Sequence, residues 1–217
     1  MRAARSAKLV VMIDRPAGAV NAALTLDVNR DASIRLARLA KQAGVPRFLF
    51  AGSCSVYGKG AKLDLDEGDP LNPLTAYAQS KIETEQQVSA LADASFSPAF
   101  LRNATAFGHS PMLRIDLVVN NLLGSALAYG EIRIQSDGTP WRPLIHIEDI
   151  SRAFLVMLKA RRELVHNQSF NVGRTEENYQ IRDIAEMVRQ TVPGSRVESA
   201  PGGGPYLRCS RVHCDKL

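Results

Sequence analysis

The sequence predicts an α/β fold in which a parallel sheet is followed by a small mixed α/β portion, and three observations support this. Short apolar runs of strand length recur along the chain, among them 8–13, 47–52 and 99–104. The first two are separated by 31–44, where apolar residues at helical spacing end at a glycine. Because such a connection is too long for a hairpin, and because uninterrupted apolar strands are typical of sheets covered on both faces, we expect the strands to be parallel.

The remaining elements follow from the same patterns. An acidic loop with two prolines is expected over 62–75, and a helix over 74–93. The second half is predicted to hold, in order, a helix (116–130), a strand (131–135), a turn (137–138), a strand (143–147), a helix (148–161), a strand (169–173) and a helix (181–190). The tail, 201–217, is turn-rich and is expected to be a loose end. We therefore divide the chain into a sheet domain, 1–110, and a portion, 111–217, whose elements partly return to that domain.

Composition excludes several classes of function. The chain has 217 residues, 45% of them hydrophobic, which is enough for one substantial core. Its net charge of +5 is scattered along the sequence and favours an anionic ligand. With 6% aromatic residues and no basic stripe, the pattern of a nucleic-acid-binding protein is missing.

The cysteines and the apolar runs bear on the compartment. Three cysteines, Cys54, Cys209 and Cys214, are too few for a disulfide framework and favour a reducing, cytoplasmic setting. No apolar run reaches the roughly 20 residues that a membrane span needs. The basic opening, 1–14, lacks the long apolar segment of an export signal, with a targeting role for its positive charges as the alternative.

Two short stretches carry residues suited to proton transfer. Tyr77 and Lys81 lie four residues apart on a predicted helix, so their side chains share one face. An ammonium held near a phenol favours the phenolate, the form in which a tyrosine acts as a base. Ser53 and Ser55 follow an apolar strand, at the end where open α/β sheets build ligand sites. The alternatives are an ordinary surface pair and a serine-rich turn.

Five motifs in register resemble one known family. "RFLFAGSCSVYG", "YAQSK", "LRNATAFG", "WRPLIHIEDISRAF" and "FNVG" are similar, in this order, to motifs of the extended short-chain dehydrogenase/reductase family, the NAD-dependent nucleotide-sugar epimerases and dehydratases. The resemblance covers roughly residues 17–190. It implies a Rossmann-like parallel sheet with a smaller C-terminal substrate-binding portion.

The resemblance also implies roles for single residues. Ser53 matches the active-site serine or threonine, Tyr77 the catalytic base, and Lys81 the lysine that also holds the nicotinamide ribose. The interval of 77 − 53 = 24 residues suits the extended branch of the family. Asn29 matches a family asparagine and joins Tyr77 and Lys81 in the expected cofactor-binding set. We expect no metal site.

Further positions match the family's substrate site. Asn121 and Arg142 match residues that contact the nucleotide diphosphate, and a guanidinium suits phosphate oxygens. For Arg142 the alternative is a surface salt bridge. Ser55 joins this set, as does Thr105, which stands where the family often has a substrate-binding asparagine. His146 lies on an apolar strand, where we expect a structural role.

The implied activity is reversible hydride transfer with NAD or NADP, between which the sequence does not choose. Tyr77, as phenolate, would remove a proton from a sugar hydroxyl while the adjacent carbon gives hydride to the nicotinamide. Family dehydratases usually carry Thr-Asp-Glu where this chain has Ser53-Cys54-Ser55. Because no carboxylate stands there, we predict an epimerase or a simple reductase and not a 4,6-dehydratase.

One part of the family pattern is missing. No glycine-rich turn joins a first strand to a helix, and 202–204, the only glycine cluster, lies at the far end of the chain. The run 8–14 corresponds at best to the fourth strand of the family sheet. The chain could be a fragment, a truncated member without activity that serves as a ligand-binding module, or a subunit completed by another polypeptide; we favour an N-terminally truncated member. Because a sheet without its first strands exposes an apolar edge, we expect a homodimer, with a nucleotide-sugar as the small-molecule partner.

Overall fold

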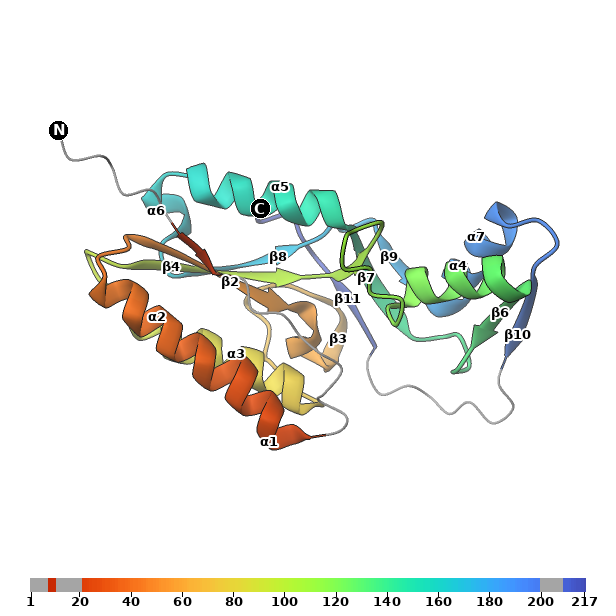
Figure 1. Ribbon diagram of the computed structural model, residues 1–217, viewed down its shortest axis with the longest axis horizontal. Helices are drawn as coiled ribbons and strands as arrows, with labels where there is room; N and C mark the ends of the chain where they lie inside the picture. The colour runs from red at the N-terminus through yellow and green to blue at the C-terminus, as the bar shows by residue number, and fades with distance from the viewer. Residues whose placement is uncertain (1–7, 11–20, 200–208) are drawn as a thin grey trace.

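The computed structural model describes residues 8–10, 21–199 and 209–217. Its main body is a four-stranded sheet in the order β1-β2-β4-β8, in which every neighbouring pair is parallel (Figure 1). The four strands are β1 (Lys8–Val10), β2 (Arg47–Ser53), β4 (Ser97–Asn103) and β8 (Gln168–Val172). The predicted α/β class with a parallel sheet is confirmed, while residues 11–13 of the predicted first strand lie outside the described residues.

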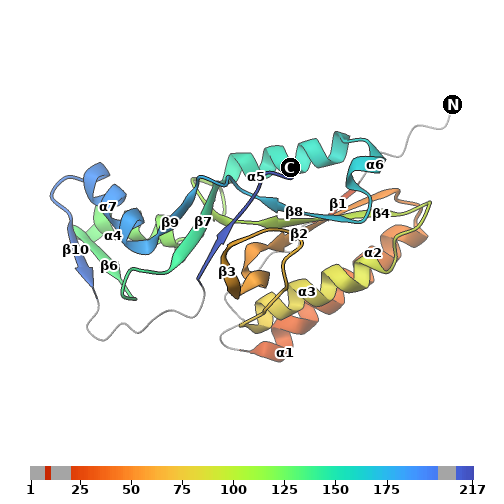
Figure 2. The same cartoon turned by 180° about the vertical axis from the view of Figure 1, so that it is seen from behind.

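Helices cover both faces of this sheet (Figures 1 and 2). One face carries α1 (Ala22–Thr25), the π-helical turn η2 (Leu26–Asp31), α2 (Ala32–Gln42) and α3 (Ala76–Ser89). The other face carries α5 (Ile147–Lys159) and α6 (Arg162–Val165). The helix predicted over 31–44 therefore begins earlier, because the side chain of Asn21 accepts a hydrogen bond from the Leu24 N–H (3.0 Å) and caps it.

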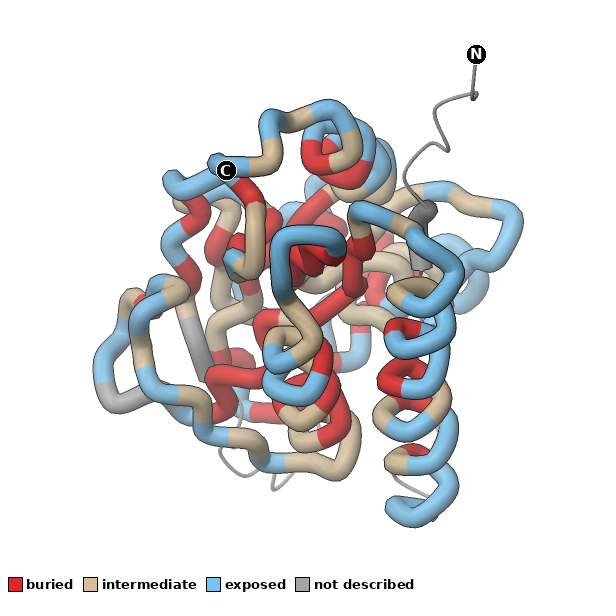
Figure 3. Tube along the Cα trace, turned by 90° about the vertical axis from the view of Figure 1, so that its left-hand side faces the viewer, coloured by how far each residue is buried: buried red, intermediate tan, exposed pale blue. Residues whose placement is uncertain are grey.

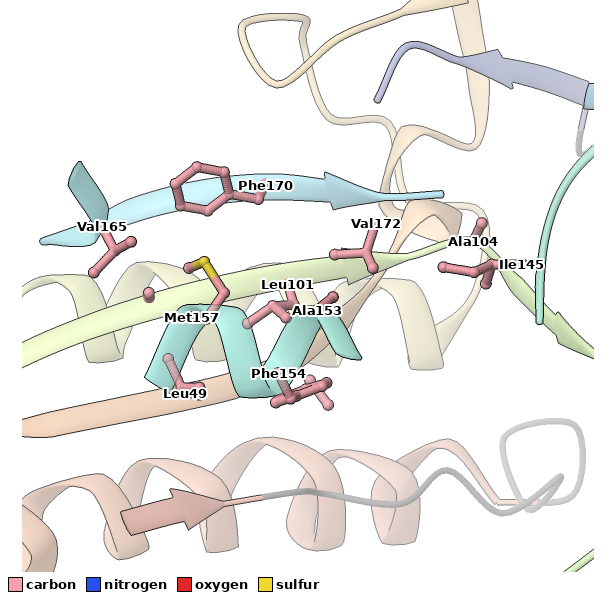
Figure 4. Packing of buried hydrophobic residues seen from close by; sticks show 12 residues of the cluster. Leu49, Leu101, Ala104, Ile145, Ala153, Phe154, Met157, Val165, Phe170 and Val172 are labelled. Carbon is pink, nitrogen blue, oxygen red and sulfur yellow. The ribbon is translucent and has the colours of Figure 1, made fainter. Parts of the chain in front are cut away.

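Alternate residues of β2 serve the two faces of the sheet. Phe48 and Phe50 are fully buried on the side of α2 and α3. Leu49 points the other way, and Figure 4 shows it close to Phe154 and Met157 of α5. Full burial of each large side chain contributes about 1.5–3 kcal/mol. The continuous apolar run in the sequence is thus one strand with two packed faces.

A smaller second part follows the sheet along the long axis of the molecule (Figure 1). It contains α4 (Val118–Tyr129), β6 (Glu131–Ile134), α7 (Ile181–Thr191) and β10 (Arg196–Ser199), with β6 and β10 parallel. A three-stranded sheet of β5 (Thr105–Phe107), β7 (Trp141–His146) and β9 (Asn178–Gln180) lies between the two parts. Leu122, Ile132 and Ile184 belong to the core of the second part. Because α5, α6 and β8 return to the main sheet, the chain crosses between the parts more than once.

Two predictions about irregular segments need correction. The loop predicted over 62–75 is wrong at 62–65, which belong to a strand, β3 (Lys59–Leu65), and is confirmed over 66–75. The tail predicted to be loose contains β11 (Cys209–Val212), which pairs with β3 in parallel. The Asn178 side chain donates to the Val212 carbonyl (3.1 Å) and accepts from the Val212 N–H (2.9 Å), which fixes the tail further. Composition does not reveal such pairing, because the two strands lie far apart in the sequence.

Burial follows the layers of the fold. Figure 3 shows buried residues gathered in the interior and exposed residues on loops and outer helix turns. Of the helices in the described ranges, none is long and apolar enough to cross a membrane. The candidate site described next lies where β2 ends and α3 begins.

Candidate active site

Ser53 is the last residue of β2, at the carboxyl end of the parallel sheet. Its backbone is extended, and its Oγ accepts a hydrogen bond from the Ser55 N–H (3.2 Å). This bond caps a short 3₁₀ helix, η3 (Cys54–Tyr57). Ser53 is half-buried, and the bond leaves its hydroxyl proton for another partner. The Ser55 Oγ is buried without a hydrogen-bond partner among the described residues.

Tyr77 and Lys81 come from the first turns of α3. Thr75 caps this helix, its Oγ1 accepting from the Ala78 N–H (3.2 Å). Lys81 is only 2% exposed, and its Nζ donates to the carbonyl of Ala51 (2.9 Å), two residues before Ser53. The same Nζ lies 5.4 Å from the centroid of the Tyr77 ring. A buried ammonium therefore ties Tyr77 to the strand that ends in Ser53.

The middle position of the serine-cysteine-serine run does not face the site. The Cys54 Sγ donates to the carbonyl of Arg102 (3.0 Å) inside the core. Burial raises the pKa of the Cys54 thiol well above its usual range. Cys54 is therefore a neutral core residue and cannot serve as an acid or base near neutral pH.

A buried polar network behind the site was not predicted from the sequence. Arg102 of β4 binds Glu85 of α3 with both ends of its fork, at 2.5 Å (Nη2 to Oε1) and 3.2 Å (Nε to Oε2). Its Nη1 donates to the Tyr57 hydroxyl (3.0 Å), which donates to the Asn171 Oδ1 (2.7 Å). Burial raises the pKa of the Tyr57 phenol, so it stays a neutral donor. An arginine inside an apolar strand was the available signal, because such a residue needs a buried partner.

Asn29 lies between two helices. It is 3% exposed, within the π-helical turn η2, and its backbone carbonyl accepts from the Ser33 Oγ (2.5 Å) and the Thr84 Oγ1 (3.4 Å). Thr84 belongs to α3, so Asn29 joins the turn to the helix that carries Tyr77. Single π turns are frequent at functional sites. The assignment of Asn29 to cofactor binding stays a prediction.

The remaining predicted residues belong to the second part and its connection. Thr105 begins β5 and pairs with Leu144 of β7. Asn121 is exposed on α4. Arg142 lies half-buried on β7, and its Nη1 donates to the carbonyl of Trp141 (2.6 Å). The structure thus places Ser53 and Ser55 at and just after the carboxyl end of β2, and Tyr77 and Lys81 in the first turns of α3. Thr105, Asn121 and Arg142 lie on other elements, β5, α4 and β7.

His146 has a structural role, as predicted. It is the N-cap of α5, and its Nδ1 accepts from the Glu148 N–H (3.3 Å). Its ring lies edge-on to Phe107, with centroids 5.4 Å apart. Because Nδ1 accepts this bond, the ring proton is assigned to Nε2.

Comparisons with known proteins identify the family of the chain. Residues 9–173 match the profile of the NAD dependent epimerase/dehydratase family. The UDP-glucose 4-epimerase of Mus musculus is 27% identical over 181 residues, which cover 75% of this chain and 52% of that protein. The UDP-glucose 4-epimerase of Azospirillum brasilense is 27% identical over 194 residues, covering 81% of this chain and 56% of that protein. The chain therefore spans about half the length of the curated relatives it matches.

Solved structures share the fold over nearly the whole chain. MoeE5 in complex with UDP-glucuronic acid and NAD superposes with a TM-score of 0.80 at 27% identity, covering 96% of this chain and 70% of MoeE5. TunA, an NAD dependent NDP-hexosamine 5,6-dehydratase, gives a TM-score of 0.79 at 25% identity, covering 96% of this chain and 67% of TunA. The UDP-glucose 4-epimerase of Thermotoga maritima with UDP-glucose gives 0.79 at 21% identity, which bears on the fold alone.

Proposed function

The chain belongs to the NAD dependent epimerase/dehydratase family, and from this premise we propose that it carries the proton-transfer site of a nucleotide-sugar epimerase or reductase that uses NAD or NADP. The observation that carries the proposal is the contact of the buried Lys81 ammonium with both the Tyr77 ring (5.4 Å) and the Ala51 carbonyl (2.9 Å). Burying a lysine is unfavourable because its ammonium loses hydration, so buried lysines are found where other groups interact with the charge.

In this proposal each side chain has one task. Tyr77 removes the proton from a sugar hydroxyl, because the positive charge of Lys81 stabilises the phenolate that must form. The Ser53 hydroxyl, at the carboxyl end of β2, forms a hydrogen bond with the same sugar hydroxyl. Returning the proton from Tyr77 to the product completes the cycle. When bound, the nicotinamide cofactor supplies the hydride acceptor and donor.

The described residues fit one end of that cofactor. Tyr77 and Lys81 offer a hydroxyl and an ammonium, which suit the hydroxyls of the nicotinamide ribose. We propose no residues of this chain for the pyrophosphate end, because the sequence contains no glycine-rich turn between a first strand and a helix. The cofactor is proposed as NAD or NADP, because the sequence does not identify the acidic residue that distinguishes them in Rossmann sites.

The reaction class is an epimerisation or a reduction and not a 4,6-dehydration. Elimination of water requires an additional acid and base beside Tyr77. The buried Cys54 thiol, which donates to the Arg102 carbonyl, supplies neither. A purified protein that forms a 4-keto-6-deoxy sugar would overturn this part of the proposal.

The proposed substrate is a nucleoside-diphosphate sugar. MoeE5 was solved in complexes with UDP-glucuronic acid and UDP-glucose, and several sequence relatives are UDP-glucose 4-epimerases. On this chain, the Arg142 guanidinium and the exposed Asn121 amide are the groups proposed to contact the diphosphate. Thr105 and Ser55 are proposed to contact the sugar.

The second candidate is a ligand-binding module without turnover, because the sequence contains no glycine-rich turn for a cofactor pyrophosphate. Fluorescence titration with NADH, followed by incubation with NAD and UDP-glucose, separates the two candidates. Binding with product formation supports the enzyme, and binding of UDP-glucose without turnover supports the module. Failure to bind either ligand removes both.

Self-association belongs to the same proposal. Leu24, Val28, Leu36 and Leu39 are 48%, 45%, 39% and 55% exposed along the outer side of α1, η2 and α2. They lie on one run of helical segments that a π-helical turn interrupts. We propose them as part of a homodimer contact, to be tested by sedimentation of Leu39→Glu against the unaltered protein.

A further inference from the structure

Glu85 and Arg102 form a buried ion pair behind the candidate site. Their side chains are 13% and 6% exposed, and the bond is bidentate. Glu85 follows Lys81 by four residues on α3, so Tyr77, Lys81 and Glu85 lie along neighbouring turns of one helix face. The Glu85 Oε1 also accepts from the Ser169 Oγ of β8 (2.6 Å). One carboxylate thus fixes the helix to two neighbouring strands.

The same guanidinium holds the other half of the site. The Arg102 Nη1 donates to the hydroxyl of Tyr57, which ends the 3₁₀ helix that begins directly after Ser53. The backbone carbonyl of Arg102 accepts from the Cys54 Sγ in the same helix. Arg102 therefore contacts both the helix that presents Tyr77 and the segment that leaves Ser53.

We propose that Glu85 and Arg102 are positioning residues, which set the distance and angle between Tyr77 on α3 and Ser53 at the end of β2. This inference rests on the proposed function of that site. Neither residue touches the reacting atoms. They act through the backbone of α3 and through Tyr57.

The alternative is an ion pair that only stabilises the fold. The two roles predict different results when both members of the pair are replaced. Replacing both members of a buried ion pair by apolar side chains of similar volume is often neutral or stabilising, whereas removing one member leaves a buried charge without its partner. A purely stabilising pair is thus replaceable. A positioning pair is not, because methionines pack without fixing an angle.

The test compares the double variant Glu85→Met/Arg102→Met with a matched double variant of an exposed pair, Glu186→Met/Arg189→Met. Arg189 and Glu186 are 49% and 46% exposed at a similar distance (2.6 Å) on α7, away from the site. Thermal unfolding reports on the fold. The ¹³Cζ resonance of Tyr77, assigned by its loss in Tyr77→Phe, reports on the site without any cofactor.

We expect the buried double variant to fold while its Tyr77 resonance changes position and its titration moves to higher pH, as Lys81 and the phenol separate. The exposed double variant keeps the original resonance. A buried double variant that melts cooperatively with an unchanged Tyr77 titration overturns the inference. If that variant does not fold, Arg102→Lys decides, because it keeps the charge but cannot hold Glu85 and Tyr57 together. A changed Tyr77 titration in folded Arg102→Lys supports positioning, and an unchanged one overturns it.

Affinity for NADH is measured on the same variants. If the unaltered protein binds NADH, the buried double variant is expected to bind at least tenfold more weakly and the exposed one equally well. If the unaltered protein binds no NADH and does not turn over a nucleotide-sugar, the proposed function fails. The Tyr77 resonance then still decides whether the pair positions this side chain.

Discussion

The substitution Glu85→Gln tests whether the buried ion pair is satisfied as described. Glutamine keeps the length of the side chain and an oxygen that accepts from Ser169, but it removes the charge opposite Arg102. The Arg102 guanidinium, 6% exposed, is then buried without a counter-charge. Breaking a buried pair in this way costs about 3–5 kcal/mol of the free energy of unfolding. For a chain of this size each kcal/mol lowers Tm by about 2–4 °C, so we expect a decrease of roughly 6–20 °C.

The measurement is thermal unfolding followed by far-ultraviolet circular dichroism, with Glu186→Gln as the matched control. Glu186 pairs with Arg189 at nearly the same distance but at the surface, where water screens the charges. We expect little change in Tm for this control. Equal decreases in Tm for the two variants would contradict this prediction, because the two pairs differ mainly in how far their charges are buried.

Three further predictions concern other parts of the chain. Gly58 has φ +56°, and a Cβ there would meet a backbone oxygen, so Gly58→Ala should lower Tm far more than Gly44→Ala, where φ is +72° but space is open. Asn178→Ala removes both side-chain bonds to Val212 and should speed amide exchange in β11 relative to β8, while unchanged exchange would contradict the described strand. A lysine ammonium and a hydroxyl donate to Asp93 and lower the pKa of its carboxyl. The stability that the Asp93 carboxylate contributes is therefore present at neutral pH and lost as pH falls below about 4. In Asp93→Asn the free energy of unfolding in urea should decrease less steeply over this acidic range.

Most of the main sheet could be predicted because its strands are short apolar runs that can be recognised in the sequence. The runs 47–52 and 99–104 are uninterrupted and apolar, which is what burial on both faces requires, and both are strands. β3 and β11 could not be predicted in the same way. Each is short and polar in part, and each exists because the other lies beside it. The composition of one segment does not indicate which distant segment will pair with it.

The candidate site likewise has features that local sequence predicts and features that depend on tertiary packing. The spacing of Tyr77 and Lys81 predicted their shared helix face, and the structure places the ammonium 5.4 Å from the ring centroid. The position of Ser53 at a strand end also follows from local pattern. The ion pair of Glu85 and Arg102 depends on the stacking of a helix on a strand, which no local pattern records.

Product formation by Tyr77→Phe tests most directly whether Tyr77 is the base of the site. The unaltered protein and the variant are incubated with NAD and UDP-glucose, and the anomeric proton of a new sugar is followed by NMR. Tyr129→Phe, altered at a tyrosine that is 78% exposed on α4, serves as the control. We expect turnover by the unaltered protein and the control, and a rate at least about 100-fold lower in Tyr77→Phe, the usual contribution of a positioned acid or base. Turnover by Tyr77→Phe at the rate of the unaltered protein would contradict this role of Tyr77.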